Sequence, residues 1–244
     1  MISNFPFINV YKKSNSRSEL VTQLLFGDSF EKLKINNSWI KIKNAGDRYQ
    51  GFIKNKKYLK VYKTTHKVSS LYASMYSRPS IKSKIKKKIT FSSKVQVIGE
   101  EKLFYKINNL WVKKKDLKKI NYKDEEIFKN IKKFINVKYK WGGKSFNGID
   151  CSGLVQVFFN FNNKFCPRDA KDQIKYFKKK IKLENIKKND LIFWKGHVAI
   201  AISKNYLVHA YGPYKRTVMM PIQKTIDIIF KTANLKVLGI RRVN

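Results

Sequence analysis

The sequence has few cysteines, few histidines and few acidic residues. Its 244 residues include two Cys, three His and 16 Asp or Glu, against 54 Lys or Arg. Two cysteines, Cys151 and Cys166, are too few for a disulfide framework or a four-cysteine zinc site, so we expect no metal and no cofactor. No apolar run approaches the ~20 residues that cross a bilayer, so we expect no membrane span.

The net charge of +38 at pH 7 raises the question of a nucleic-acid or other anionic partner. Two observations weaken that interpretation. The charge is spread over both halves of the chain, and only seven of the basic residues are Arg, whose forked guanidinium is favoured for phosphate and base recognition. Lys, Asn and Ile are abundant together, which is typical of an AT-rich genome. We therefore expect a solvated basic surface and no nucleic-acid partner.

The N-terminal residues do not form a convincing signal peptide. Their positive charges, at Lys12 and Lys13, follow the apolar residues instead of preceding them, and no small-residue cleavage site is present. With so few cysteines as well, the sequence predicts a reduced, cytoplasmic protein.

The first half of the chain has the pattern of short strands. Apolar runs separated by turn-forming residues recur about every ten positions, which is typical of small β-barrels. We predict two such all-β barrels, at residues 8–64 and 65–120, and expect the lysine run 84–88 to be a solvated loop. The predicted strands are 30–33, 39–42, 49–53, 94–98, 103–107 and 111–112.

The pattern changes after Asp124. Residues 125–135 carry apolar side chains at helical spacing, which predicts a helix. A glycine-rich loop then leads to Asp150, a natural N-cap, and to an apolar helix that begins with Cys151. Further on, 197–203 and 206–211 are predicted to be two strands joined by a tight turn. Helices packed on an antiparallel sheet give an α+β domain at residues 123–244.

Cys151 and two histidines form the strongest candidate for chemistry. A thiol at the first turn of a helix is stabilised as the thiolate by the helix dipole and by free N–H groups, so we expect Cys151 to ionise more easily than a free cysteine. His197 and His209 lie on consecutive predicted strands downstream, which is the chain order of a papain-like site. His197 would take the thiol proton, His209 would orient His197, and the Cys151 N–H would be the first oxyanion donor.

Each of these residues also has a structural interpretation. A single Cys before an apolar helix is more often a packing residue, and a single strand His is usually structural. The register of the predicted hairpin is also open, and a slip of one residue would place the two histidines on opposite faces. We interpret Cys166, His66 and Trp111 as structural.

Several motifs resemble the NlpC-type, papain-like cysteine peptidases of bacterial cell-wall metabolism. The most specific is Asp150-Cys151-Ser152-Gly153, followed by two histidines. By this resemblance Cys151, His197 and His209 are the catalytic triad, and Tyr139 lies near the oxyanion. The matching segments are residues 139–143, 148–156, 167–173, 189–193, 196–200 and 208–210.

The resemblance extends upstream to one subgroup, the γ-D-glutamyl-diamino-acid dipeptidyl peptidases. Residues 18–28, Trp39 and residues 47–52 resemble its first bacterial SH3-type barrel, although Arg48 and Phe52 stand where Gly and Trp are usual. The subgroup has two such barrels before the catalytic domain, and the first closes one end of the cleft. The implied substrate is a murein stem peptide with a free N-terminal L-Ala, cut between D-Glu(γ) and diaminopimelate or lysine. The residues that match its amine-binding set are Asp150, Ser152, Glu19 and Tyr49.

Other functions stay open at this stage. One alternative is a secreted peptidoglycan endopeptidase that uses the barrels to bind the wall. Another is a catalytically inactive protein that binds wall glycan or nucleic acid. A papain-like site would also support an amidase or acyltransferase, because other nucleophiles can capture the acyl-enzyme. Our preferred prediction is a peptidase of murein tripeptides that acts in wall recycling, with diaminopimelate and lysine undistinguished.

Overall fold

The N-terminal segment forms an open antiparallel sheet in the computed structural model, which describes residues 1–243. The strand order is β2-β1-β5-β4-β3, and no pairing joins β2 to β3 in the part of the chain described. The predicted barrel at 8–64 is therefore not closed, although the strands expected near 30, 39 and 49 are confirmed. The strands are β1 (Phe7–Tyr11), β2 (Leu20–Leu25), β3 (Phe30–Asn36), β4 (Trp39–Asn44) and β5 (Gln50–Lys54).

The second segment contains two sheets around a small core of its own. The larger has the order β10-β11-β12-β7-β8 and the smaller β13-β6-β9, again without closing into a barrel within residues 1–243. Its elements are β6 (His66–Val68), β7 (Tyr72–Tyr76), β8 (Ile85–Thr90), β9 (Lys94–Val95), β10 (Gly99–Glu101), β11 (Phe104–Ile107), β12 (Leu110–Lys113), the 3-10 helix η1 (Lys114–Asp116) and β13 (Leu117–Lys119).

The lysine run at 84–88 corrects one prediction. It lies largely in β8, at the edge of the larger sheet, and its side chains are exposed. Charged lysines on an edge strand discourage pairing with another chain, which is why a run this polar is compatible with a strand.

The third segment packs helices against a six-stranded antiparallel sheet, as the α+β prediction requires. The sheet order is β16-β21-β17-β18-β19-β20. Helix α1 packs on the face that carries Val198, Ile200 and Val208, and α3 packs with the core of the opposite face. The elements are β14 (Lys144–Ser145), β15 (Gly148–Ile149), α1 (Cys151–Phe161), α2 (Ala170–Tyr176), β16 (Lys180–Ile181), the 3-10 helix η3 (Leu183–Asn185), β17 (Asp190–Trp194), β18 (His197–Ala201), β19 (Tyr206–Tyr211), β20 (Arg216–Pro221), α3 (Ile222–Ala233) and β21 (Gly239–Arg242).

The helix predicted at 125–135 is wrong. This stretch forms turns and one short 3-10 helix, η2 (Ile131–Phe134). Its backbone bonds join residues three apart, such as Ile131 N–H to the Phe128 carbonyl. Phe128, Ile131 and Phe134 are buried at a spacing of three, which suits a 3-10 turn better than an α-helix.

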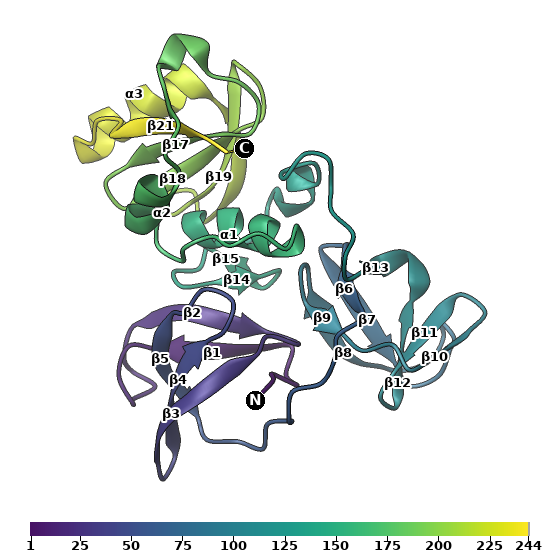
Figure 1. The fold of residues 1–244 in the computed structure, drawn as a ribbon. Coiled ribbons are helices and arrows are strands. Elements are labelled where there is room, and N and C mark those ends of the chain that lie inside the picture. The colour runs from purple at the N-terminus through teal and green to yellow at the C-terminus, as the bar shows by residue number, and fades with distance from the viewer. Residues whose placement is uncertain (244) are drawn as a thin grey trace.

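Helix α1 lies where the three segments meet (Figure 1). Near its start, the Lys144 N–H donates to Gln23 Oε1 of β2 at 2.9 Å. At its end, the buried ammonium of Lys67 on β6 donates to the Phe161 carbonyl and, at 2.5 Å, to the Tyr122 carbonyl. The second segment therefore binds the last residue of this helix, and the first segment binds strand β14, which precedes the helix.

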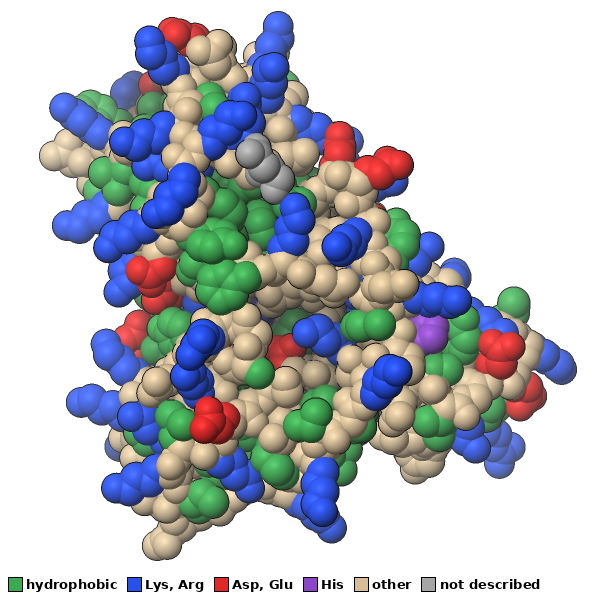
Figure 2. All heavy atoms as spheres, in the orientation of Figure 1, with side chains coloured by type: hydrophobic (Ala, Val, Ile, Leu, Met, Phe, Trp, Pro, Cys, Tyr) green, Lys and Arg blue, Asp and Glu red, His purple; other side chains and the backbone are tan. Residues whose placement is uncertain are grey.

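Lysine and arginine side chains lie over all three lobes on the face shown in Figure 2, with few acidic groups between them. Among residues 1–243, no helix is both long enough and apolar enough to cross a membrane.

Candidate active site

Cys151 occupies the first position of α1, as the sequence predicts. The Asp150 carboxylate caps the helix by accepting the Gly153 N–H at 2.7 Å, which satisfies one of the unpaired donors of the first turn. The Cys151 side chain is 6% exposed, and its Sγ lies 4.0 Å from the Gly196 carbonyl oxygen. The thiol is therefore fixed against the segment that leads into β18.

Burial opposes ionisation of the Cys151 thiol in the unliganded site. Burial raises the pKa of Cys151 to about 12, and the negative charge of Asp150 adds to that effect. Hydrogen bonds from the Val198 and Ser152 backbones and the positive charge of Arg168 lower the pKa, but they do not offset desolvation. The expectation of an easily ionised thiol is wrong for the unliganded site, so the proton must leave as the nucleophile attacks.

His197 and His209 are joined by a hydrogen bond. His197 Nε2 lies 2.9 Å from His209 Nδ1, and the ring centroids are 5.1 Å apart. The two histidines therefore share a face of the sheet, which decides the hairpin register that the sequence leaves open. Burial lowers the pKa of His197 to about 4 and that of His209 well below its ordinary value, so both rings are neutral near pH 7.

The sulfur sits beside the backbone on both sides of His197. It approaches the carbonyl of Gly196, and the Val198 N–H forms a hydrogen bond that lowers its pKa. No hydrogen bond joins Sγ to the His197 ring in the described residues. Since Nε2 of His197 faces His209, Nδ1 is the nitrogen left for the thiol proton. This is the order that an acid–base histidine needs, with one nitrogen oriented and the other reactive.

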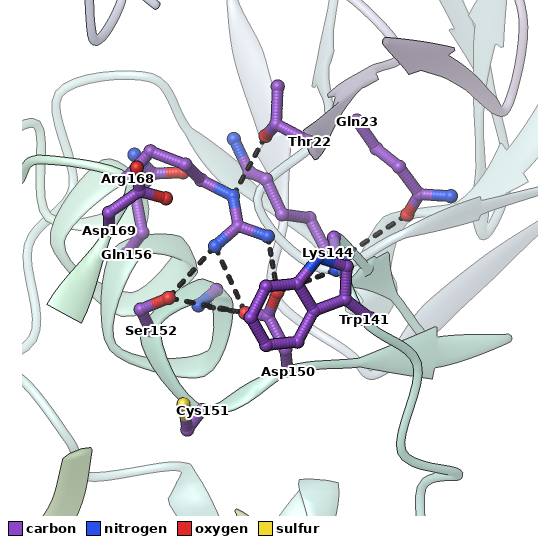
Figure 3. A network of polar contacts seen from close by, with 12 residues as sticks. Thr22, Gln23, Trp141, Lys144, Asp150, Cys151, Ser152, Gln156, Arg168 and Asp169 are labelled. Atoms are coloured by element: carbon purple, nitrogen blue, oxygen red, sulfur yellow. Dashed lines mark hydrogen bonds and ion pairs between the residues drawn. The ribbon is translucent and has the colours of Figure 1, made fainter. Parts of the chain in front are cut away.

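A buried ion pair fixes the turn before the helix (Figure 3). Arg168 Nη2 and Nη1 lie 2.6 Å and 3.0 Å from the two oxygens of Asp150, and both side chains are buried. The same guanidinium donates to Ser152 Oγ at 2.9 Å and to Thr22 Oγ1 of β2 at 2.9 Å. Asp150 also accepts the Gly142 N–H at 2.8 Å. These contacts join the helix start, the glycine loop and the first segment.

Gly142 allows the loop to approach the first segment closely. Its φ is +71°, a left-handed conformation that favours glycine. A Cβ at this position would clash with the Leu20 carbonyl oxygen. The Trp141-Gly142 pair can therefore lie directly against the end of β2.

A pocket of about 360 Å³ opens between the first and third segments. Cys151 and Gly196 line it from the third segment, and Glu19 and Tyr49 line it from the first. The remaining lining residues are Lys12, Val21, Trp141, Asp150, Ser152, Arg168, Asp169, Ala170 and Lys171. The nucleophile is therefore reachable from a groove that the N-terminal sheet borders.

Two carboxylates line this pocket besides the paired Asp150. Glu19 accepts hydrogen bonds from Trp141 Nε1 at 3.0 Å and from Lys12 Nζ at 3.1 Å, and these bonds lower its pKa. The Tyr49 hydroxyl donates to Asp169 Oδ2 at 3.3 Å, while burial raises the pKa of Asp169. The pocket thus offers a bound cation two carboxylates, Glu19 and Asp169, that do not belong to the Asp150–Arg168 ion pair and that can accept hydrogen bonds.

Tyr139 lies outside this pocket lining. Its ring packs against Gly212, and its pKa is raised by burial and by the charge of Cys151 when ionised. The tyrosine is therefore close enough to the sulfur to be influenced by it. Its predicted place near the oxyanion stays a prediction.

The structure brings most of the predicted residues together. Five of them line the pocket, and the two histidines form a hydrogen-bonded pair on β18 and β19. Trp141, Arg168 and Asp169 had no predicted role, although all three lie within segments 139–143 and 167–173, which resemble the peptidase family. The five in the pocket are Cys151, Asp150, Ser152, Glu19 and Tyr49.

No cluster of three or more His, Cys, Asp or Glu that could hold a metal ion occurs within residues 1–243.

Comparison with known families identifies two parts of the chain. Residues 136–227 match the NlpC/P60 family, and residues 10–57 match the bacterial dipeptidyl-peptidase SH3 domain. One SH3-type domain is shown in this way. The assignment of residues 65–120 as a second one stays a prediction.

The chain is also similar to characterised proteins over most of its length. It is 26% identical to dipeptidyl-peptidase 6 of Lysinibacillus sphaericus, over 83% of this chain and 84% of that protein. It is 25% identical to a γ-D-glutamyl-L-lysine dipeptidyl-peptidase of Bacillus subtilis strain 168, over 84% and 77% of the two chains. A crystal structure of an NlpC/P60 family protein from Bacillus cereus ATCC 10987 superposes with a TM-score of 0.82, at 19% identity, covering 99% of this chain and 98% of that one.

These findings agree with the site geometry. The fold is that of the Bacillus cereus protein, and the Cys151 helix and both histidine strands lie within the NlpC/P60 match. The chain is an enzyme, with a cysteine peptidase domain of the NlpC/P60 type.

Proposed function

We propose that this cysteine peptidase acts on peptidoglycan peptides and cleaves the γ-D-glutamyl–diamino acid bond of murein stem peptides that have a free N-terminal L-Ala. The names of the two relatives support this proposal, since both are called dipeptidyl-peptidases and one is named for γ-D-glutamyl-L-lysine. An enzyme that releases dipeptides needs a group that binds the free N-terminal amine at a fixed distance from the nucleophile.

One observation carries the proposal: the pocket that contains Cys151 also contains the carboxylates of Glu19 and Asp169. A substrate ammonium that leaves water needs anionic hydrogen-bond acceptors. Asp150 is a weaker candidate for direct contact, because Arg168 already occupies both of its oxygens. We assign amine binding to Glu19 and Asp169, with Tyr49 holding Asp169 in place, and retain Asp150 and Ser152 as the wall beside the nucleophile.

The reaction follows from these positions. As Cys151 Sγ attacks the γ-carbonyl carbon of D-Glu, its proton passes to His197 Nδ1, and the Cys151 N–H binds the oxyanion. When the C–N bond breaks, His197 gives that proton to the amine of the departing diamino acid. Water then attacks the thioester with His197 as base, which releases the dipeptide L-Ala-D-Glu with a free γ-carboxylate and restores the thiol.

The test compares a free and a blocked amine. Mass spectrometry would follow cleavage of L-Ala-γ-D-Glu-diaminopimelate and its N-acetyl derivative. We expect the acetylated peptide to react at least ~100-fold more slowly, since it lacks the charge that Glu19 and Asp169 would bind. Equal rates for both peptides would overturn the proposal and favour an endopeptidase that acts on intact wall.

Matched variants separate the binding wall from surface charge. Glu19→Gln and Asp169→Asn should each raise KM for the free peptide more than they lower kcat. Glu31→Gln, an exposed carboxylate on β3 of the same sheet, should change neither value. If the Glu19 and Asp169 variants behave like Glu31→Gln, the amine is bound elsewhere.

We place the reaction in the recycling of wall peptides in the cytoplasm. A free L-Ala amine arises only after the stem peptide has been removed from the glycan, so the substrate is a released tripeptide. Fractionation of the source cells should find the protein with the soluble cytoplasmic contents. Recovery of the protein from the culture medium would refute this assignment.

A further inference from the structure

Met220 touches the second histidine from the side opposite His197. In the β19–β20 pairing His209 faces Val218, and Met220 lies two residues beyond Val218 on the same face of the sheet. Diagonal neighbours of this kind are within reach of long side chains. The Met220 Sδ lies 3.5 Å from His209 Nε2, so the buried His209 ring has a hydrogen-bond partner at each nitrogen.

The chemistry of these two partners is unequal. A thioether sulfur accepts a hydrogen bond and has no proton to donate, whereas the imidazole of His197 can do either. A contact between Met220 Sδ and His209 Nε2 is therefore favourable only if Nε2 carries the proton. His209 Nδ1 is then an acceptor, and it must receive the Nε2 proton of His197.

We propose that Met220 is a positioning residue that fixes the tautomers of both histidines and so leaves His197 Nδ1 unprotonated toward Cys151. The proposal deepens the proposed function, because it rests on His197 acting as the base. The opposite arrangement would place a proton on His209 Nδ1 and a lone pair against the sulfur. His197 would then carry its own proton on Nδ1, where it could not accept the thiol proton.

No other group near His209 sets its tautomer in the part of the chain that the structure describes. The side chain is fully buried, with 0% exposure, so bulk water does not compete for Nε2. The Tyr211 ring stacks on it at 4.6 Å between centroids, with 13° between the planes, and holds the imidazole flat. The Tyr211 hydroxyl makes no hydrogen bond to His209 in the described residues, so Met220 and His197 decide the tautomer.

Nitrogen NMR tests the tautomers directly. The chain has only three histidines, so long-range 1H–15N spectra of 15N-histidine protein contain three ring systems, with His66 as an internal reference. We expect His197 and His209 of the unmodified protein both to carry the proton on Nε2 at neutral pH. A proton on Nδ1 of His209 would overturn the proposal, whatever the variants do.

Three variants then link the tautomer to the rate. Met220→Leu removes the acceptor at similar volume, so we expect Nδ1–H signals to appear for both histidines and kcat to fall about tenfold with KM unchanged. Met220→Gln restores an acceptor oxygen and should return both the Nε2–H pattern and most of kcat. Met219→Leu, at a half-exposed position on the same strand, should resemble the unmodified protein.

The outcomes separate this proposal from the proposed function. The spectra are recorded without substrate, so they report the tautomers of His197 and His209 even if the peptide substrate is misassigned. A Met220→Leu variant that keeps both Nε2–H signals would show that sulfur does not set the tautomer, and the proposal would be wrong. If Met220→Leu does not fold, the spectrum of the unmodified protein and of Met220→Gln decides.

Discussion

Replacement of Arg168 by Ala should destabilise the chain far more than loss of a surface cation. The side chains of Arg168 and Asp150 are 1% and 8% exposed, and the guanidinium holds both carboxylate oxygens. Its removal leaves a buried carboxylate with fewer donors, which costs about 3–5 kcal/mol when one partner of a buried pair is lost. The unfolding equilibrium constant should rise about a hundredfold to several thousandfold.

Urea unfolding followed by tryptophan fluorescence measures this loss. Arg168→Lys keeps the charge but not the fork that grips both oxygens, so its loss should be intermediate. The control is Lys114→Ala, which breaks a pair with Glu100 whose side chains are 32% and 61% exposed and should cost no more than about 1 kcal/mol.

Arg168→Ala should also make Cys151 react more slowly as a nucleophile. Arg168 lowers the pKa of Cys151 and Asp150 raises it, so an unpaired Asp150 leaves the thiol harder to ionise. Iodoacetamide should therefore alkylate Cys151 more slowly in Arg168→Ala, measured in a Cys166→Ala background. A stability loss below about 1 kcal/mol together with unchanged alkylation would refute the role given to the pair.

Three further results are expected. Cys151→Ser should abolish detectable product in the mass-spectrometric assay while its urea midpoint stays near that of the parent, because a hydroxyl is a far poorer nucleophile here. His209→Ala should lower kcat yet leave measurable turnover, since this residue orients the base; full activity would remove it from the triad. The free energy of unfolding should fall as the pH drops from 6.5 toward 4. In this range His197 binds a proton in the unfolded chain but not in the folded protein, where its pKa is lowered to about 4. The loss at pH 5 is up to about 2 kcal/mol, and urea titrations at pH 7 and 5 should show a smaller difference in His197→Gln.

The parts of the site predicted from sequence are those set by local chemistry. An Asp before an apolar helix is a capping signal that acts within three residues, and it fixed the place of Cys151. The strands of His197 and His209 follow from alternation and a tight turn, whereas their register, which the sequence leaves open, is given by the pairing of Ile200 with Val208 and by the bond between the rings. These interactions depend on near neighbours along the chain.

What the sequence missed depends on contacts between distant segments. Arg168 is a single basic residue among 54, and its role arises only where it meets Asp150 and Thr22. The sequence predicts an acidic Cys151 because it reveals the helix dipole at this position but not the burial that opposes ionisation. The 3-10 turns near Phe128 share their apolar spacing with a helix, so periodicity alone could not distinguish them.

The placement of helix α1 has a consequence for the synthesis of the chain. Gln23, which binds strand β14 before the helix, and Lys67, which binds the last residue of the helix, precede these contacts by roughly a hundred residues and leave the ribosome first. Since domains fold as they emerge, helix α1 would pack against two upstream segments that have already folded. A fragment that begins after residue 122 would have to form the same helix without the contacts from Gln23 and Lys67.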